Sequence, residues 1–589
     1  MTRRLRVLLL GIFALMLGLS ARLTVLQILH AEEYRALSTD NAIQQQRVAP
    51  LRGRILARDG TALATSRLAV DLMYRGGEIH NWQRISFLAG AGEEPRPPDP
   101  TNLRERSLGV ALASNLPDEV VPAVEELVAG QDSLYLFRRT ERTYPTSLAA
   151  HLLGYTTEAD PQRFPGYAVG ELYGLMGLEA SYQETLFGTP GLSLQEVNSR
   201  RAVVKTTEIS PAKPGSDLTL TIDPGLQRAA EEALARALEN QRAGKLARDR
   251  PALELEQTAT RGALVALDPR SGEILALASQ PGFDQHLFTR RPPDNAGISA
   301  LLGDAAYQPT MNRAVNAFEP GSTFKLLTAS ALLENGHVGA GTRYLCTPAY
   351  TFGGIVFRNW YSQGSRGNQT LTQAIADSCN TWFYQATDRA GWSPFAEQMQ
   401  ARARQLGFGQ PVGLGLLEER GGLVPTDAWV RERWGHAWRP GMTVNMAIGQ
   451  GDLLVTPVQI AQMLATIVMG GRRVQPHLVK RIGDRPVEVP VTLVPGRHWD
   501  TLKQGMMGTT REGGTAYHRL GPHRFAVVTG GKTGTAQAPG ADSHAWYMGY
   551  GPVASPEIVV VAFFQNGGEG SGVALPAVTD FMAVYWGLE

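Results

Sequence analysis

The chain has 589 residues, more than one hydrophobic core usually supports, so we expect at least two domains. Hydrophobic residues make up 43% and charged residues 19%, which is typical of a folded protein and excludes general disorder. The 56 basic residues nearly balance the 55 acidic ones, and this balance disfavours nucleic-acid binding. With only two cysteines, Cys346 and Cys379, the chain cannot form a disulfide scaffold or a four-cysteine zinc module.

The N-terminus carries three arginines between residues 3 and 6, followed by an apolar run over 7–29 that Arg22 interrupts. A run of this length is about what a helix needs to cross a bilayer, roughly 20 residues. We therefore predict a cytoplasmic tail over 1–6 and a transmembrane anchor over 7–29, with the N-terminus inside. A cleaved signal peptide is the alternative, but the small-residue cleavage pattern near Ser20 is poor.

Residues 65–215 mix short helical and strand-like pieces without one clear period. The segment 52–60 (RGRILARDG) reads as an extended piece with a turn, and 91–100 is a proline-rich polar loop. We predict a mixed, elongated N-terminal region over 30–215, of the pedestal or dimerisation kind, and derive no fold for 65–215.

A second unit is predicted over 216–589. A strand at 218–221 precedes a helix that begins at Asp223-Pro224, and two apolar strands, 262–268 and 273–279, are joined by a turn. Further strands are predicted at 525–528, 544–550 and 557–565, with a last helix over 577–586 and helices between 320 and 475. This pattern predicts an α/β (α+β) domain, an antiparallel sheet flanked by helices.

The first motif with chemical meaning is the segment 320–325 (PGSTFK), which opens a helix that is apolar on nearly all sides. Ser322 and Lys325 are three residues apart and share a face of its first turns. A buried ammonium is poorly solvated, which favours the neutral amine, and a neutral lysine can take the proton of a serine hydroxyl. Chance could also supply such a pair, so the motif is weak alone.

The second motif is the segment 378–380 (SCN), in a helical stretch that begins near Thr370. Ser378 could relay a proton, and the Asn380 amide could hold an amide of a substrate. An ordinary helix cap is the alternative interpretation of these two side chains.

The third motif is the segment 530–535 (GGKTGT), which follows the strand predicted at 525–528. Gly534 would let a ligand approach the strand closely. Lys532, one of only seven lysines, offers a cation to a carboxylate, and Thr533 and Thr535 offer hydroxyls. A glycine-rich strand end with an exposed lysine is the alternative.

Together the three motifs are specific. Ser-x-x-Lys, Ser-x-Asn and Lys-Thr-Gly in this order are the motif set of class A β-lactamases and penicillin-binding proteins. The chain resembles a class B penicillin-binding protein along most of its length, including the N-terminal apolar run, the segment 52–60 and the segment 449–459 (GQGDLLVTPVQ). No glycosyltransferase domain precedes the motifs, which argues against class A. Segments 174–182 and 196–198 are similar to the elongation-type enzyme, penicillin-binding protein 2.

The resemblance implies a penicillin-binding transpeptidase fold and D,D-transpeptidation of peptidoglycan stem peptides on lipid II-derived glycan strands. Ser322 would attack the penultimate D-Ala carbonyl, with Lys325 as general base. Backbone N–H groups of Ser322 and Thr535 would form the oxyanion hole. Ser378 would pass the proton to the leaving D-Ala, with Lys532 nearby.

The resemblance also assigns the substrate contacts. Thr533 and Thr535, beside Gly534, would hold the terminal carboxylate, and Asn380 would hold the stem amide. An amine of a second stem would then resolve the acyl-enzyme and make the cross-link. β-Lactams would acylate Ser322 as mimics of the substrate.

No cofactor is implied. Some relatives of penicillin-binding protein 2 carry a zinc site near the Ser-x-Asn motif, built from Asp, His and Cys. Here the segment 357–370 has neither Asp nor His, and Cys379 alone cannot hold a metal, so we predict no metal site. Cys379 is expected to be a small buried residue. A disulfide between Cys346 and Cys379 stays open, because sequence cannot place the two sulfurs within bonding range.

Elongation-type relatives work with a polytopic glycosyltransferase of the shape, elongation, division and sporulation (SEDS) family, of the RodA type. We expect the same partner here, and a single-pass protein of the inner (cytoplasmic) membrane whose catalytic domain lies in the periplasm or outside the cell. The alternatives are a division-type transpeptidase, a D,D-carboxypeptidase or β-lactamase-like hydrolase, and a scaffold that mainly activates a membrane glycosyltransferase. A β-lactamase would need a glutamate base, which no segment clearly supplies.

Overall fold

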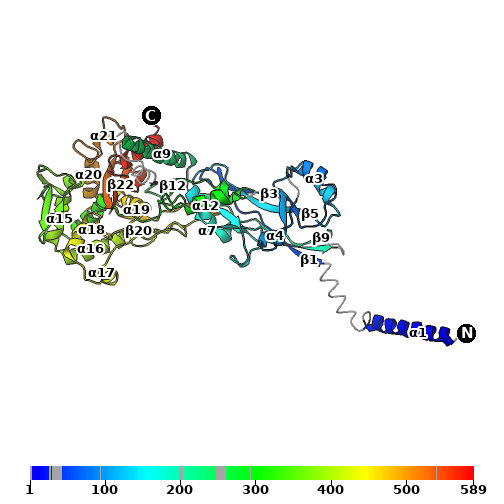
Figure 1. Ribbon diagram of the computed structural model, residues 1–589. Coiled ribbons are helices and arrows are strands. Elements are labelled where there is room, and N and C mark those ends of the chain that lie inside the picture. Colours follow the sequence, from blue (N-terminus) through cyan, green and yellow to red (C-terminus); the bar gives the residue numbers. More distant parts are fainter. Residues whose placement is uncertain are drawn as a thin grey trace.

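The computed structural model describes residues 3–25, 28, 43–92, 95–197, 203–246, 261–291, 293–538 and 540–588. The body of the molecule is elongated (Figure 1). One end holds most of the helices and the C-terminus, and the other end holds long strands of the N-terminal region. Helix α1 (Arg3–Thr24) lies apart from this body.

A five-stranded antiparallel sheet forms the centre of the C-terminal region, in the order β12-β11-β23-β22-β21. Strands β11 and β23 are buried at every position, which explains their continuous apolar sequences. Strand β21 lies at one edge of the sheet. The five strands are β11 (Gly262–Leu267), β12 (Ile274–Gln280), β21 (Gly530–Ala538), β22 (Ala541–Gly551) and β23 (Ile558–Phe564).

Helices cover both faces of this sheet. Because side chains alternate along a strand, Leu264 and Ala266 join one core cluster, whereas Val265 and Leu267 join another. Helices α9 (Pro224–Leu246) and α22 (Ala574–Trp586) cover the first face. Helix α19 (Pro457–Val468) covers the second face, and α13 (Lys325–Glu334) belongs to the same cluster. The predicted antiparallel sheet between helices is therefore observed.

The other elements of the C-terminal region surround this centre. Its strands form small pairs: β13 (Tyr344–Leu345) with β16 (Asn368–Gln369), β14 (Ala349–Phe352) with β15 (Ile355–Arg358), and β17 (Arg472–Val474) with β20 (Val491–Leu493). Its remaining helices are α11 (His286–Thr289), α12 (Asn295–Gly303), α14 (Leu371–Ala376), α15 (Asn380–Ala390), α16 (Trp392–Gln405), α17 (Asp427–Trp434), α18 (Pro440–Ala447), α20 (Trp499–Gly508) and α21 (Tyr517–Leu520).

A second, seven-stranded sheet joins the two predicted regions. Its order is β19-β18-β10-β2-β3-β4, and β5 also pairs with β3. Strand β10 is parallel to β2 and antiparallel to β18, so segments from both sides of residue 215 share one sheet. The strands are β2 (Ile55–Leu56), β3 (Ala62–Tyr74), β4 (Val110–Ala113), β5 (Leu134–Thr143), β10 (Leu218–Leu220), β18 (Val479–Ile482) and β19 (Arg485–Pro486).

The rest of the N-terminal region packs around β3 and β5. Helices α3 (Trp82–Ala89) and α5 (Val121–Val128) form a separate small core with these strands. A three-stranded sheet has the order β1-β8-β9, with β1 (Ile43–Val48), β8 (Gly191–Val197) and β9 (Val203–Ser210). The other elements are α4 (Leu103–Leu108), α6 (Ala150–Leu153), β6 (Thr156–Glu158), β7 (Leu172–Gly174), α7 (Gly177–Ser181) and α8 (Gln183–Phe187).

Two predictions near the chain ends differ from the structure. The strand predicted at 525–528 is wrong, because strand β21 begins later, at Gly530, and the Lys-Thr-Gly motif itself forms the strand. The predicted span over 7–29 is not confirmed. Within the described residues no helix combines the length and apolarity needed to cross a membrane, and residues 26, 27 and 29 lie outside them.

Candidate active site

The nucleophile candidate lies where a 3-10 turn leads into a buried helix. Turn η2 (Gly321–Phe324) carries Ser322, which is partly exposed, and α13 begins at Lys325, which is fully buried. Gly321 has a φ of 54°, and a Cβ there would lie 2.6 Å from the backbone oxygen of Thr535. The glycine thus allows the turn that bears Ser322 to contact strand β21 directly.

The Ser-x-Asn motif occupies the sharp turn between α14 and α15. Ser378 has a φ of 57°, which is uncommon for a residue with a side chain. The next residue, Cys379, caps α15 by accepting a hydrogen bond from the backbone N–H of Trp382. Asn380 is the first residue of α15. The motif was predicted inside a helical stretch, and the structure instead breaks the helix at Ser378, so that its hydroxyl leaves the helical path.

The Lys-Thr-Gly motif lies in the edge strand β21. Lys532 and Thr533 are buried, whereas Thr535 is exposed. A Cβ on Gly534 would lie 2.9 Å from the Thr323 methyl and 3.1 Å from the Pro320 oxygen, so glycine is needed for the strand to pack against η2.

The backbone of β21 shows which residues face its open edge. The backbone oxygens of Gly531 and Thr533 accept hydrogen bonds from the side chains of Thr509 (3.1 Å) and Lys532 (2.9 Å). In an antiparallel edge strand, alternate residues turn their N–H and C=O groups away from the partner strand. By this alternation Thr535 also presents its N–H outward, where the predicted oxyanion hole requires it.

Two buried amines meet at the hydroxyl of Ser378. Lys532 Nζ donates to Ser378 Oγ over 2.8 Å, and Lys325 Nζ lies 3.3 Å from the same oxygen. Lys325 Nζ also donates to the Ser378 backbone oxygen (2.7 Å) and to Asn380 Oδ1 (2.5 Å). Four predicted site residues from three distant segments therefore converge. The Ser322 hydroxyl makes no hydrogen bond within the described residues.

Burial decides the electrostatics of both amines. Desolvation lowers the pKa of Lys325 well below its ordinary value, and the neighbouring charge of Lys532 lowers it further. Desolvation also lowers the pKa of Lys532, to about 7, while the carboxylate of Asp377 opposes the shift. When neutral, Lys325 can donate its two N–H groups to Ser378 and Asn380 and keep a lone pair for a proton.

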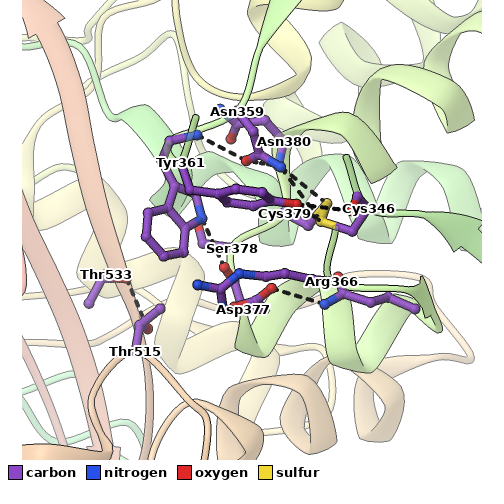
Figure 2. A network of polar contacts seen from close by, with 12 residues as sticks. Cys346, Asn359, Tyr361, Arg366, Asp377, Ser378, Cys379, Asn380, Thr515 and Thr533 are labelled. Atoms are coloured by element: carbon purple, nitrogen blue, oxygen red, sulfur yellow. Dashed lines mark hydrogen bonds and ion pairs between the residues drawn. A yellow bond between two sulfur atoms is a disulfide. The ribbon is translucent and has the colours of Figure 1, made fainter. Parts of the chain in front are cut away.

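An acidic residue, Asp377, precedes the Ser-x-Asn motif, and desolvation raises the pKa of its carboxyl. It pairs with Arg366 and accepts a hydrogen bond from Gln369 over 2.9 Å. The indole N–H of Trp360 donates to the Asp377 backbone oxygen over 3.1 Å. These contacts, several of which appear in Figure 2, hold the turn that carries Ser378.

A disulfide joins Cys346 to Cys379. In the chain, Cys379 stands between Ser378 and Asn380 of the motif. Asn359 lies next to the disulfide (Figure 2). The Asn359 amide nitrogen contacts Cys379 Sγ at 3.6 Å, and its oxygen accepts the backbone N–H of Asn380 at 3.1 Å. The sequence left open whether Cys346 and Cys379 pair, and the structure shows that both sulfur atoms belong to this disulfide. Among the described residues no group of three or more His, Cys, Asp or Glu side chains is placed to hold a metal.

Several residues of the site were not predicted from the sequence. The Thr515 hydroxyl accepts a hydrogen bond from the Thr533 hydroxyl over 3.1 Å, and Thr515 comes from a loop with no motif. Asp377 could have been noticed beside Ser378, but its ion pair with Arg366 depends on an irregular segment. No sequence pattern marks Asn359, because its contacts with Cys379 and Asn380 form only when the chain folds.

Two family models match the chain. The penicillin-binding protein transpeptidase domain matches residues 262–583, and the penicillin-binding protein dimerisation domain matches residues 47–220. The first match covers more than half of the chain and includes all three motifs.

Similar curated proteins and solved structures support the same family assignment. The peptidoglycan D,D-transpeptidase MrdA of Acinetobacter baumannii is 29% identical, with 97% of this chain and 85% of the relative covered. A chain of the solved structure described as "Structural coordination of polymerization and crosslinking by a peptidoglycan synthase complex" is 45% identical, with a TM-score of 0.79, and 100% of this chain and 99% of that chain are covered.

Pseudomonas aeruginosa PBP2, known from a crystal structure, is 28% identical with a TM-score of 0.67, and 92% of this chain and 96% of that chain are covered. The chain therefore belongs to the penicillin-binding proteins with a transpeptidase domain and, as the sequence resemblance predicted, to the branch of penicillin-binding protein 2.

Proposed function

We propose that this chain is a peptidoglycan D,D-transpeptidase that cross-links stem peptides during cell elongation through an acyl-enzyme on Ser322. The observation that carries this proposal is the buried chain of contacts from Lys325 through Ser378 to Lys532. Such a chain can remove a proton from a nucleophile and deliver it to a leaving group without a histidine. The curated relatives, which are peptidoglycan D,D-transpeptidases by name, support the same reaction.

In the proposed acylation, the neutral Lys325 amine takes the proton of Ser322 as the serine oxygen attacks the penultimate D-Ala carbonyl. The backbone N–H groups of Ser322 and Thr535 stabilise the oxyanion. The Ser378 hydroxyl, which lies between the two amines, passes a proton to the amine of the leaving D-Ala. The acyl-enzyme is then attacked by an amine of a second stem peptide.

Substrate contacts follow from the open edge of β21. An extended stem peptide would pair with this edge, as peptides often add to exposed strands. Thr533, Gly534 and Thr535 would surround the terminal carboxylate, helped by the charge of Lys532. The Asn380 amide, which already contacts Lys325, would hold the stem amide.

Benzylpenicillin tests this function directly. Intact-mass analysis should show one covalent adduct, which peptide mapping places on Ser322, and Ser322→Ala should carry none. We expect the adduct to persist for many minutes, as in a transpeptidase. Release within seconds would favour a β-lactamase-like hydrolase, and an adduct on another residue would reject the proposed nucleophile.

We further propose a division into a cytoplasmic tail (1–6), a membrane anchor (7–29), an N-terminal pedestal (30–215) and a transpeptidase domain (216–589), with the catalytic domain outside the inner membrane. Support for the anchor comes from the exposed apolar side chains of α1, among them Leu10, Phe13 and Leu15. Fractionation of cells should place the full chain in the membrane pellet. A variant that lacks residues 1–30 but remains in that pellet would reject the anchor.

The proposed partner is a membrane glycosyltransferase of the SEDS family, and the 45%-identical relative comes from a structure of a peptidoglycan synthase complex. Co-purification in detergent, with and without residues 1–30, tests this partner. We expect the full chain to retain the glycosyltransferase through the anchor and the region before residue 215. Failure of the full chain to co-purify would argue against this partner.

A further inference from the structure

A polar pocket of about 330 Å³ lies in the C-terminal region, outside the candidate active site. Its walls are the last turn of α16, the loop over 407–412, helix α19, and the strand pair of β17 and β20. Helix α16 and strand β20 both belong to the end of the molecule that holds most of the helices (Figure 1). No residue of the three motifs is among its described lining residues, so the pocket is a separate feature. We call it the Arg404 pocket.

Two arginines give the pocket a positive charge. Arg404 comes from α16 and Arg473 from β17, and no acidic residue is found among the described residues of the lining. Arg473 stands directly opposite Thr492 of β20, and the side chains of such a cross-strand pair lie on the same face. The pocket therefore offers two cations and a hydroxyl, a combination that favours a negatively charged ligand.

The fold uses one of two neighbouring arginines in α16 and leaves the other without a partner. Arg402 donates to Ser330 Oγ over 2.9 Å and to the Pro495 backbone oxygen over 2.6 Å, so its role is structural. Arg404, in the same last turn, is exposed, and its side chain makes no hydrogen bond or ion pair with any other part of the chain that the structure describes. All the donors of its guanidinium remain available to a ligand.

The second cation, Arg473, is only partly exposed, and burial lowers the pKa of its guanidinium. Its Nη1 donates to the Gln405 backbone oxygen over 2.6 Å, and within the described ranges no carboxylate pairs with it. A charge that is withdrawn from water without an opposite charge is costly, and partly buried arginines are usually paired. An anion in the pocket would supply the missing counter-charge.

A third polar group indicates what else the ligand must carry. Gln462 of α19 lines the pocket and is 5% exposed, and its amide oxygen is buried without a hydrogen-bond partner in the described structure. A Cβ on Gly407 would lie 2.3 Å from this oxygen and 3.5 Å from Arg473 Nη1, so the amide lies next to the guanidinium. Buried polar atoms nearly always have a partner, and this oxygen lacks a donor. The fitting ligand therefore combines negative charge with a hydrogen-bond donor.

We propose that the Arg404 pocket binds hydrogenphosphate or the phosphate group of a small phosphate monoester. Two negative charges match the two guanidinium groups, whose planar forks bind phosphate oxygens in a bidentate way. Hydrogenphosphate keeps one P–O–H donor for the Gln462 oxygen, and the hydroxyl groups of a glycerol or sugar phosphate can serve instead. The proposal does not depend on the proposed transpeptidation, because no residue of the motifs lines the pocket.

Equilibrium dialysis of the full-length protein in detergent with radiolabelled inorganic phosphate tests the proposal. At about pH 8 most of this phosphate is the dianion. We expect one binding site per chain. Arg404→Gln and Arg473→Gln should each weaken binding about tenfold, because each removes a charge-assisted contact. Arg404 is exposed, so its replacement provides a folded variant even if circular dichroism shows that Arg473→Gln unfolds.

Two comparisons make the test specific. Arg433→Gln makes the same chemical change on an exposed residue of α17 outside the pocket, and it should bind phosphate like the unmodified chain. Sulfate has the shape and charge of hydrogenphosphate without its hydrogen, and it should bind roughly threefold more weakly. Equal affinity for sulfate would overturn the part assigned to Gln462.

The source of the phosphate is tested by competition. Glycerol 3-phosphate, a free monoester, should displace the labelled phosphate. Displacement only by phosphatidylglycerol in the same detergent micelles would assign the pocket to a lipid diester and overturn the monoester. Absence of binding would overturn the inference. So would an affinity that is unchanged in both Arg404→Gln and Arg473→Gln, because the phosphate would then occupy another cationic site, such as that of Lys325 and Lys532.

Discussion

The two lysines of the site have the same side chain and different environments. Lys325 is held by acceptors from the Ser-x-Asn turn, whereas Lys532 reaches the same Ser378 hydroxyl from strand β21. Both amines are buried, and the negative charge of Asp377 raises the pKa of each, against the effect of burial. Because two ammonium groups this close repel one another, the site favours a state in which at least one amine is neutral.

We predict that Lys325→Arg lowers the rate of benzylpenicillin acylation by roughly 10²- to 10⁴-fold, the usual contribution of general-base catalysis. A guanidinium stays charged and cannot take the serine proton. Since burial lowers the pKa of Lys325, the unmodified rate should fall as the pH drops through that lowered pKa. The rate should therefore reach its plateau well below the ordinary lysine pKa of about 10.4. A rate that keeps climbing until the pH reaches that ordinary pKa would contradict the neutral-amine base.

The sequence predicted the residues of the three motifs better than the residues that hold these motifs in place. Ser378, Lys325 and Lys532 could be selected because the spacing of their motifs is specific, and the structure brings them together. Thr515 and Asn359 could not, because their contacts depend on where irregular segments run in space.

At the scale of elements, the site depends on how closely three pieces of backbone approach. Gly321 packs its Cα against the Thr535 oxygen, and a Cβ on Gly449 would lie 2.1 Å from the Gly321 oxygen. The turn of the nucleophile is therefore enclosed between β21 and the 449–451 turn. No side chain fits there, so the spacing of the proposed oxyanion donors, the N–H groups of Ser322 and Thr535, is set by backbone contact.

Gly321→Ala should therefore destabilise the fold and reduce acylation of Ser322 at least tenfold, because its Cβ would meet the Thr535 oxygen at 2.6 Å. Gly336→Ala is the matched control. Gly336 has a φ of +72°, but a Cβ there would meet nothing within 4 Å. The variant Gly336→Ala should therefore lose only the conformational strain of a positive φ, about 1 kcal/mol in the free energy of unfolding. Acylation rates and urea unfolding midpoints should separate the two variants, and equal effects would show that contact with β21 is unimportant.

The disulfide closes a loop with a sequence separation of 33 residues. Restriction of the unfolded chain by such a loop is worth about 3–4 kcal/mol in the entropic model. Dithiothreitol should thus lower the melting temperature of the unmodified chain. Cys346→Ser, which cannot form the bond, should melt at the lower temperature with or without the reductant. An identical melting temperature before and after verified reduction would contradict this account.

Element prediction succeeded where the apolar pattern was strong. The strands at 262–268 and 273–279 were recognised because they are apolar throughout and joined by a turn, and both lie within a buried sheet. Strand β21 was misplaced because its sequence is rich in glycine and polar residues, which propensity assigns to a loop. Its partners, β22 on one side and η2 on its face, supply the stability that local preference lacks.

At the scale of the whole molecule, the N-terminal and C-terminal regions are not independent bodies. One hydrophobic cluster contains Ile55, Leu152 and Leu178 together with Leu220 and Val455, so the core continues across residue 215. This explains why no fold could be derived for 65–215 alone, since much of its apolar surface is completed by segments that come later in the chain.

A buried charge cluster lies within this shared structure. Glu179 accepts hydrogen bonds from Arg52 Nε (2.6 Å) and Arg142 Nε (2.7 Å), and all three side chains are at most 1% exposed. Glu179→Gln would leave two buried guanidinium groups without a counter-charge. We predict a loss of about 3–5 kcal/mol in the free energy of unfolding, measured by urea denaturation.

Glu184→Gln provides the comparison, because Glu184 is an exposed residue of α8. This substitution should change the free energy of unfolding by less than about 1 kcal/mol. A similar small effect for Glu179→Gln would mean that the cluster contributes little to the joining of the two regions.

The seven-stranded sheet has a practical consequence for attempts to shorten the protein. A fragment that begins at residue 221 would lack β2 and β10, and β18 would lose the neighbour that covers one of its sides. The unpaired backbone N–H and C=O groups of β18 could then form hydrogen bonds with the same strand of another copy, which is the usual origin of edge-to-edge aggregation. Light scattering should find such a fragment in large particles, whereas a fragment that begins at residue 43 and keeps the whole sheet should remain dispersed.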